Sequence, residues 1–155
     1  MVHSCDVPGF HYQMSTTWEM PPGITPFDVV YWIGYAVEHS EELRLANVVI
    51  DCHGGPGILY VGGKDYPPVS GGNLSWFSML RNKSIGTVWL VACQVALGSK
   101  GQGFCRQLAR TLGCDVIAAD APQFTENSYI RGNCPFGTID DFEGTMYRFS
   151  PSKDK

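Results

Sequence analysis

Two residues suited to nucleophilic chemistry follow two short apolar runs of this sequence. Residues 48–52, Val-Val-Ile-Asp-Cys, lead into His53 and Gly54, and residues 88–92, Val-Trp-Leu-Val-Ala, lead into Cys93. Runs of this length, rich in β-branched residues, are typical of strands buried on both faces of a parallel sheet. Ligands of open α/β sheets bind beyond the carboxyl ends of such strands. We therefore expect an imidazole and a thiol to face each other across one crevice.

The chemistry that this pair predicts is acyl transfer. A cysteine attacks as its thiolate, so a nucleophilic Cys93 needs an imidazole nearby, and His53 can supply it. The oxyanion that forms needs backbone N–H donors, which we assign to Gly54 and Cys93 because glycine leaves its amide unobstructed. Gly55 and Gln94, the next residue in each segment, are expected to line the bound substrate. The order of the two residues, His before Cys, excludes the papain-like arrangement, in which Cys comes first.

Helical patterns separate these strands. Residues 25–28, Thr-Pro-Phe-Asp, combine a capping side chain, a proline at the first helical position and an acidic residue three positions after the cap. They predict a helix that ends near Leu43. Further helices are predicted around 74–81 and from about 102 to Leu112. Additional strands are predicted at 58–61, 116–119 and 145–149, with a weaker one at 10–16.

Alternation of strands and helices predicts an α/β fold with right-handed crossovers and a mostly parallel sheet flanked by helices on both faces. A chain of 155 residues is about one average domain. We expect a single domain over 1–155, in which 1–24 have no clear pattern and 150–155 fray at the end.

Composition excludes several classes of protein. The formal net charge is -4 and the Lys and Arg residues are scattered, which argues against a nucleic-acid surface. No apolar run approaches the roughly 18 to 20 residues of a membrane helix. The six cysteines form no C-x-x-C pair and no zinc spacing, and the first residues do not resemble an export signal. We expect a cytoplasmic protein with reduced thiols, no metal and no cofactor, and the oligomeric state stays open.

The two segments that contain His53 and Cys93 resemble the motifs of a known family. Residues 49–57, Val-Ile-Asp-Cys-His-Gly-Gly-Pro-Gly, and residues 91–96, Val-Ala-Cys-Gln-Val-Ala, resemble the two signature blocks of the caspase-like (clan CD) cysteine peptidases. These blocks are a strand ending in His-Gly and a later strand ending in Ala-Cys. The resemblance covers 48–120, about half of the chain, and is greatest to a caspase-like domain of large bacterial surface proteins.

The resemblance implies a caspase-like α/β/α sandwich and a bacterial cysteine endopeptidase that cleaves a peptide or protein substrate. In this family His53 would be the general base and Cys93 the nucleophile. Asp120 follows the next buried strand, where the clan builds its primary specificity pocket, so it would favour a basic side chain at the cleavage point. No caspase-type inter-subunit linker is visible, so activation by cleavage is not implied.

Other interpretations stay open beside this one. The chain is alternatively a catalytically silent interaction domain with the same fold, or a thiol hydrolase or effector that acts on a non-peptide amide or ester. Asp120 is otherwise a turn or cap residue, and Asp51 either orients a group behind the site or bonds loop amides. Cys52 is expected in the core, on the face of the strand opposite to His53, which argues against a zinc site there. The remaining histidines are expected to be inert: His3, His11 and His39.

Overall fold

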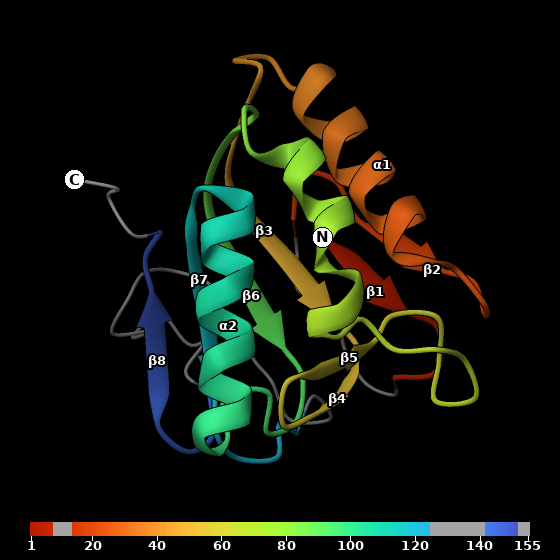
Figure 1. Ribbon diagram of the computed structural model, residues 1–155. Coiled ribbons are helices and arrows are strands. Elements are labelled where there is room, and N and C mark those ends of the chain that lie inside the picture. The colour runs from red at the N-terminus through yellow and green to blue at the C-terminus, as the bar shows by residue number, and fades with distance from the viewer. Residues whose placement is uncertain (8–13, 125–141, 152–155) are drawn as a thin grey trace.

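The computed structural model describes residues 1–7, 14–124 and 142–151. Within them one mixed sheet contains six strands in the order β2-β1-β3-β6-β7-β8 (Figure 1). The bounds of these strands are β1 (Val2–Ser4), β2 (Trp18–Met20), β3 (Arg44–Asp51), β6 (Ser84–Val91), β7 (Asp115–Ala119) and β8 (Met146–Phe149). All neighbours are parallel except β8, which runs antiparallel to β7. The mostly parallel α/β sheet predicted from the sequence is confirmed.

The two central strands, β3 and β6, have the same burial pattern. Their first four residues are exposed or half-buried, and their last four are fully buried. The buried halves are the apolar runs at 48–51 and 88–91, which are covered on both faces. The carboxyl ends of the central strands are therefore the most enclosed part of the sheet.

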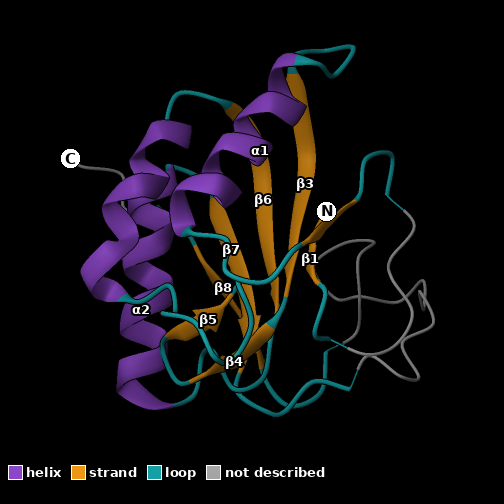
Figure 2. Ribbon diagram, turned by 90° about the vertical axis from the view of Figure 1, so that its right-hand side faces the viewer, coloured by secondary structure: helices purple, strands orange, loops and turns teal. Residues whose placement is uncertain are grey.

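The described helices all lie on one face of the sheet (Figure 2). They are α1 (Pro26–Glu38), the 3₁₀ helix η1 (Gly71–Leu80) and α2 (Gly98–Leu112), and their apolar residues share one core cluster with the strands. The sequence predicted helices on both faces. The connections β2 to β3, β3 to β6 and β6 to β7 all step across the sheet in the same direction, so right-handed crossovers place every helix on the same side. In the described ranges, no helix is long and apolar enough to cross a membrane.

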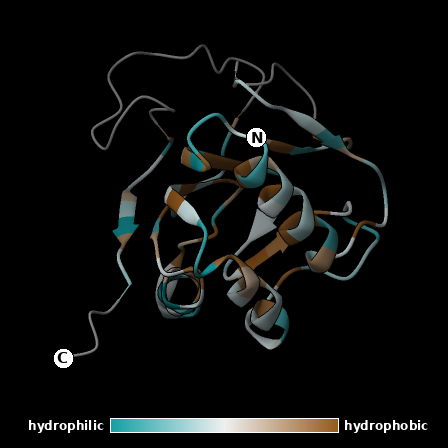
Figure 3. Cartoon of the chain, turned by 90° about the horizontal axis from the view of Figure 1, so that it is seen from above, coloured by the Kyte–Doolittle hydropathy of each residue, from teal (hydrophilic) through white to brown (hydrophobic). Residues whose placement is uncertain are grey.

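The apolar core has two parts, one on each face of the sheet. The larger lies under the helices. Figure 3 shows that hydrophobic residues are concentrated toward the centre of the fold, between the helices and the sheet. The smaller lies on the opposite face and consists of Met1, Val49, Trp89, Val91, Ile117, Ala119 and Phe142. The Trp89 indole N–H donates to the Asn47 side chain at 2.9 Å, so this large residue is buried with its polar atom satisfied.

Several predicted boundaries differ from the structure. Helix α1 ends at Glu38, five residues before Leu43, because the His39 imidazole donates to the Tyr35 carbonyl (2.8 Å) and Leu43 adopts a left-handed backbone (φ 50°). Helix α2 begins at Gly98 instead of residue 102. Of the strand predicted at 10–16, residues 10–13 lie outside the described residues and 14–16 are not a strand.

The start of α1 gives a first testable prediction. Thr25 and Asp28 form the capping box expected from the sequence, in which the Asp28 carboxylate accepts from the Thr25 N–H and hydroxyl, both at 2.7 Å. We expect Thr25→Ala to lower the free energy of unfolding at neutral pH by about 1 kcal/mol, measured by urea denaturation. The matched control is Thr111→Ala, a half-buried threonine inside α2 that caps no helix, for which a change within about 0.5 kcal/mol is expected.

The same cap has a predicted pH dependence. The hydrogen bond from the Thr25 backbone N–H is the main cause that lowers the pKa of Asp28 below its ordinary value of 3.8. A lowered carboxyl pKa adds stability above the ordinary pKa, and this stability is lost as the pH falls through the lowered pKa. The stability difference between Asp28→Ala and the original chain should therefore shrink in strongly acidic solution, where the carboxyl is protonated, and a difference that stays constant with pH would contradict the cap.

Candidate active site

The strands that carry His53 and Cys93 are neighbours in the sheet. β3 and β6 pair in parallel with Asp51 opposite Val91, and the Cys52 N–H continues this pairing by donating to the Val91 carbonyl at 3.2 Å. Both segments therefore leave the same edge of the sheet side by side. The two strand ends therefore meet at one edge, and a crevice between the imidazole and the thiol stays a prediction.

Gly54 lies directly against the segment that contains Cys93. It belongs to β4 (His53–Gly55), which forms a hairpin with β5 (Ile58–Tyr60) beneath the carboxyl ends of β3 and β6 (Figure 1). A Cβ added at Gly54 would lie 2.9 Å from the Ala92 Cβ and 3.1 Å from the Cys93 carbonyl oxygen. Only glycine allows these two backbones to approach so closely.

The orientation of the Gly54 amide follows from its partner in the hairpin. Leu59, which stands opposite Gly54, exchanges backbone hydrogen bonds with Val69 at 3.0 and 2.8 Å. Gly54 and Leu59 are therefore a pair without mutual hydrogen bonds, and the Gly54 N–H points away from β5. This direction suits the oxyanion donor that we predict for Gly54, while Gly55 is buried inside the hairpin.

The His53 imidazole is oriented by Asp6, which follows β1. Its Nε2 lies 3.0 Å from the Asp6 carbonyl oxygen and 3.8 Å from the Asp6 carboxylate, and 23% of the His53 side chain is exposed. A carbonyl oxygen only accepts, so this bond requires a proton on Nε2, and in the neutral ring the lone pair is on Nδ1. Nδ1 is therefore the atom of His53 that can take a proton from a thiol.

The Asp6 carboxylate is anchored independently of His53. It accepts from the Ser4 hydroxyl at 2.6 Å and from the Lys64 N–H at 3.2 Å. Partial burial raises the pKa of Asp6, but these two hydrogen bonds and the nearby His53 together lower the pKa below its ordinary value. Sequence reasoning missed Asp6, because the hydrogen bond to His53 uses the backbone of a residue 47 positions away, and side-chain pattern cannot reveal it.

The Cys93 sulfur contacts the segment that follows β7. It accepts the Gln123 N–H at 3.4 Å and lies 3.7 Å from the Gln123 carbonyl oxygen. Gln94 adopts a left-handed backbone (φ 58°) and its N–H donates to the Ala121 carbonyl at 2.9 Å. The Gln123 side chain in turn bonds backbone groups of Ala121 and Glu143. The Cys93 sulfur is thus held by a hydrogen-bonded loop, and Gln123 is a second residue that sequence reasoning missed.

The imidazole and the thiol share an edge of the sheet but make no hydrogen bond with each other in the described part of the chain. Asp6 draws the His53 ring toward the end of β1, and Gln123 holds the Cys93 sulfur on the side of β7. β3 and β6 lie between these two anchors. Proton transfer from Cys93 to His53 would require rotation of one or both side chains.

The other described cysteines are in different environments. Burial raises the pKa of Cys52 well above its ordinary value, that of Cys105 to about 12 and that of Cys114 to about 11. Cys52 lies in the core under the helices, as predicted. Cys5 is exposed, Cys93 is half-buried, and Cys134 lies outside the described residues. Accessible thiols in the described ranges are therefore those of Cys5 and Cys93.

Asp120 uses both carboxylate oxygens to hold the start of β8. One oxygen accepts the Thr145 N–H at 2.8 Å and the other accepts the Tyr147 hydroxyl at 3.1 Å. The Thr145 N–H is the main cause that lowers the pKa of Asp120. These contacts are those of a turn residue, and a role of Asp120 in a specificity pocket stays a prediction.

A buried pair of polar side chains lies behind the site. His3 on β1 and Asp51 on β3 stand opposite each other, with His3 Nδ1 2.8 Å from Asp51 Oδ2 and exposed fractions of 2% and 1%. Asp51 Oδ1 has no hydrogen-bond partner in the part of the chain that the structure describes. His3 was expected to be inert in a segment without pattern, and Asp51 to bond loop amides or orient a group. The structure places the two in one pair.

The described residues contain no group of three or more His, Cys, Asp or Glu side chains that could hold a metal ion. Comparisons of the chain with protein-family models, with curated proteins and with solved structures found no match.

Proposed function

We propose that this protein is a cysteine peptidase of the caspase-like type, with Cys93 as nucleophile and His53 as general base. The observation that carries the proposal is the approach of Gly54 to the backbone of Ala92 and Cys93. This contact brings an accessible thiol, a partly exposed imidazole and a backbone N–H directed away from its hairpin to one edge of a parallel sheet. The resemblance of 49–57 and 91–96 to the caspase-like signature blocks supports the same assignment.

The reaction follows from the atoms at this edge. His53 Nδ1 takes the Cys93 proton, and the thiolate sulfur bonds to the carbonyl carbon of the substrate peptide while the carbonyl π electrons move to oxygen. The N–H groups of Gly54 and Cys93 stabilise this oxyanion. Collapse of the tetrahedral intermediate breaks the C–N bond, and the imidazolium returns its proton to the leaving amine. Water, deprotonated by His53, then attacks the thioester carbon. The C–S bond breaks, the Cys93 sulfur takes the proton back from the imidazolium, and the carboxylic acid product leaves.

Asp6 fits the role of the third group that orients a catalytic base. Its carbonyl oxygen fixes the proton on Nε2, and its carboxylate at 3.8 Å favours the charged imidazolium that forms during the reaction. In this mechanism the Cys93 side chain leaves the Gln123 N–H and turns toward His53 when substrate is bound. We place the reaction in a reducing cytoplasm, where the free thiol that it requires is maintained.

A specific observation favours a second candidate function, a catalytically silent interaction domain. The imidazole and thiol are directed to different anchors, and Gln123 packs its backbone onto the Cys93 sulfur. A silent domain would keep this arrangement permanently. A thiol hydrolase of non-peptide amides or esters would use the same residues as a peptidase, so a panel of peptide, amide and ester substrates separates the two enzymes.

Mapping of covalent labels tests the proposal. We expect a peptidyl acyloxymethyl ketone, which reacts with catalytic cysteines, to label Cys93 and no other described cysteine, as identified by peptide mass spectrometry. Cys5 is the internal control, because it is exposed but has no described imidazole partner, and it should react with iodoacetamide only. Labelling of Cys5 and Cys93 at the same slow rate, or of neither, would favour the silent domain.

A further inference from the structure

An open cavity of about 430 Å³ lies between α1 and the edge strand β2, away from Cys93 and His53. It is lined by Trp18 and Glu19 from β2 and by Tyr31, Trp32 and Tyr35 from α1. Four of these five residues are aromatic, and none is a lysine or arginine. Exposed aromatic residues that gather at one place on a surface are typical of a binding site.

The rings of this cavity are arranged as inclined walls. The ring centroids of Trp18 and Trp32 are 5.8 Å apart with planes at 62°, and those of Trp18 and Tyr35 are 6.0 Å apart at 52°. Rings inclined in this way cannot stack flat on one another, so they turn their faces in different directions. Trp18 and Trp32 pack against the core, whereas Tyr31 and Tyr35 are 58% and 44% exposed. Phe27 stacks on Tyr31 (6.5 Å, 27°) and His39 stacks on Tyr35 (3.8 Å, 19°). Two walls are therefore fixed in the core, and the two exposed rings offer a ligand only the face that this stacking leaves uncovered.

The backbone of β2 adds an acceptor at the mouth of the cavity. The Trp18 N–H donates to the Met1 carbonyl, and the Met20 carbonyl accepts from the Cys5 N–H, so the polar groups of Trp18 and Met20 face β1. Backbone polar groups alternate sides along a strand, and the Glu19 carbonyl therefore points outward from the edge of the sheet. Aromatic faces and a carbonyl oxygen both present negative potential to a ligand.

We propose that this cavity binds a quaternary ammonium group. Such a cation has no N–H to satisfy, so it does not need the paired carboxylates that a primary ammonium prefers. Aromatic faces within about 6 Å attract it through their quadrupoles, and enclosure by several rings is the usual way in which proteins bind it. The four rings of the cavity supply the faces, and the Glu19 carbonyl accepts the polarised methyl C–H groups.

The quaternary ammonium group can come from two sources: a trimethyllysine side chain in a peptide, or a small molecule such as choline. A second cavity of about 640 Å³ adjoins the first and shares Trp18 and Tyr35 with it. Its lining includes the exposed acidic residues Glu41 and Glu42, together with Arg44. The second cavity provides room for residues that flank a trimethyllysine, whereas choline would occupy the first cavity alone.

Titration of the whole protein tests the proposal, with tryptophan fluorescence as the signal because Trp18 and Trp32 line the cavity. The probes are tetramethylammonium, choline, a trimethyllysine peptide, and 3,3-dimethyl-1-butanol, the uncharged isostere of choline. We expect saturable binding of the cations and binding of the neutral isostere that is weaker by about fivefold or more. Tighter binding of the peptide than of choline assigns the methylated side chain as the source, and the reverse assigns the small molecule.

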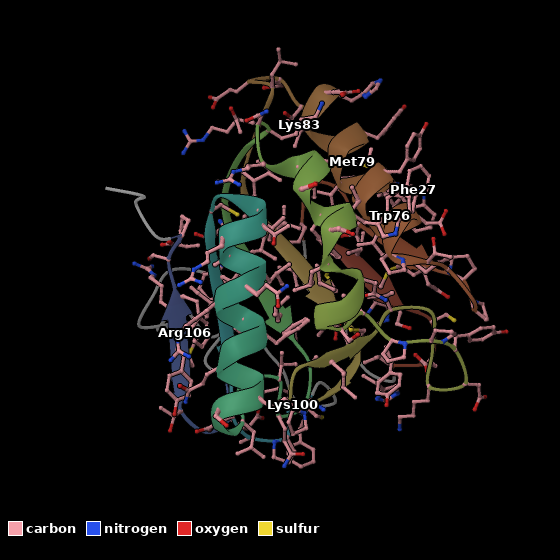
Figure 4. The ribbon with its side chains drawn as sticks, viewed as in Figure 1. Phe27, Trp76, Met79, Lys83, Lys100 and Arg106 are labelled. Carbon is pink, nitrogen blue, oxygen red and sulfur yellow. The ribbon has the colours of Figure 1, made fainter. Side chains whose placement is uncertain are left out.

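Variants of exposed aromatic residues distinguish binding in this cavity from binding elsewhere on the aromatic surface. Tyr35→Ala is expected to weaken binding by about fivefold or more, and Tyr35→Phe, which keeps the ring, should retain it. The matched control is Trp76→Ala, since Trp76 is a comparably exposed aromatic of η1 that contacts Phe27 and does not line the cavity (Figure 4). Absence of saturable binding by all three cations, or equal binding of choline and its neutral isostere, would overturn the proposal.

Discussion

Replacement of Cys93 by alanine is expected to reduce peptide cleavage by about 10⁴-fold or more, because its thiolate forms the acyl-enzyme in the proposed mechanism. The Cys93 side chain is half-buried and its sulfur has a single described partner residue, Gln123, so the substitution should leave the fold intact. Cleavage is measured on a peptide library by mass spectrometry, and folding by circular dichroism. The loss should appear in kcat, since the sulfur acts in the chemical step.

The controls for this prediction use the other residues of the site. Cys5→Ala removes the second accessible thiol of the described ranges and should leave cleavage unchanged. His53→Ala should reduce kcat by about 10³-fold or more and shift the pH dependence of cleavage, because a base is lost while the thiol remains. Retention of cleavage by Cys93→Ala would exclude Cys93 as the nucleophile. Absence of cleavage by the unaltered protein across the library, together with no labelling of Cys93, would establish the silent domain instead.

Replacement of Asp51 by alanine is expected to lower the free energy of unfolding by about 3 kcal/mol, the largest stability effect that we predict. Asp51 is 1% exposed and bonds His3, which is 2% exposed, so removal of the carboxylate leaves a buried imidazole without this partner. The loss of this buried hydrogen bond is the cause of the lower stability. Urea denaturation of the folded protein at neutral pH measures it.

The matched control for this pair is Asp115→Ala. Asp115 also lies on a central part of the sheet beside a basic residue, but its 3.5 Å pair with Arg148 is 29% and 43% exposed, so a loss below about 1 kcal/mol is expected. The double variant His3→Leu, Asp51→Leu removes both polar groups and should be more stable than Asp51→Ala. An Asp51→Ala protein that loses no more stability than Asp115→Ala would show that the buried pair contributes little.

The strands and helices that could be predicted are those whose signal is local. The apolar runs before His53 and Cys93 predicted β3 and β6, and the Thr25 to Asp28 pattern predicted the start of α1. β1 was missed because it has only three residues, and two of them are polar: His3 and Ser4. Its burial depends on the Asp51 carboxylate on a neighbouring strand, which no local pattern shows.

The same distinction applies to the site. Residue type and spacing were sufficient to place His53, Gly54 and Cys93 at one edge of the sheet. The directions of the His53 ring and the Cys93 sulfur depend on backbone groups of Asp6 and Gln123, which lie 47 and 30 positions away in the sequence. Side-chain identity does not reveal a bond made by a backbone carbonyl or amide. The residue types therefore predicted that an imidazole and a thiol lie at one edge, but could not predict which groups each of them bonds in the folded chain.

The parallel pairing of β3 and β6 also has a consequence for how the protein folds. Parallel strands cannot be joined by a tight turn, and here the chain from 52 to 83, with η1, must close as a loop before the two strands can pair. Contacts that are this distant in sequence slow folding, because the entropy of loop closure is lost before the pairing stabilises the chain. His53 and Cys93 therefore become neighbours only after this slow step. Because the loop at Cys93 is docked on β7, the reactivity of the Cys93 thiol during refolding can show when the native sheet has formed.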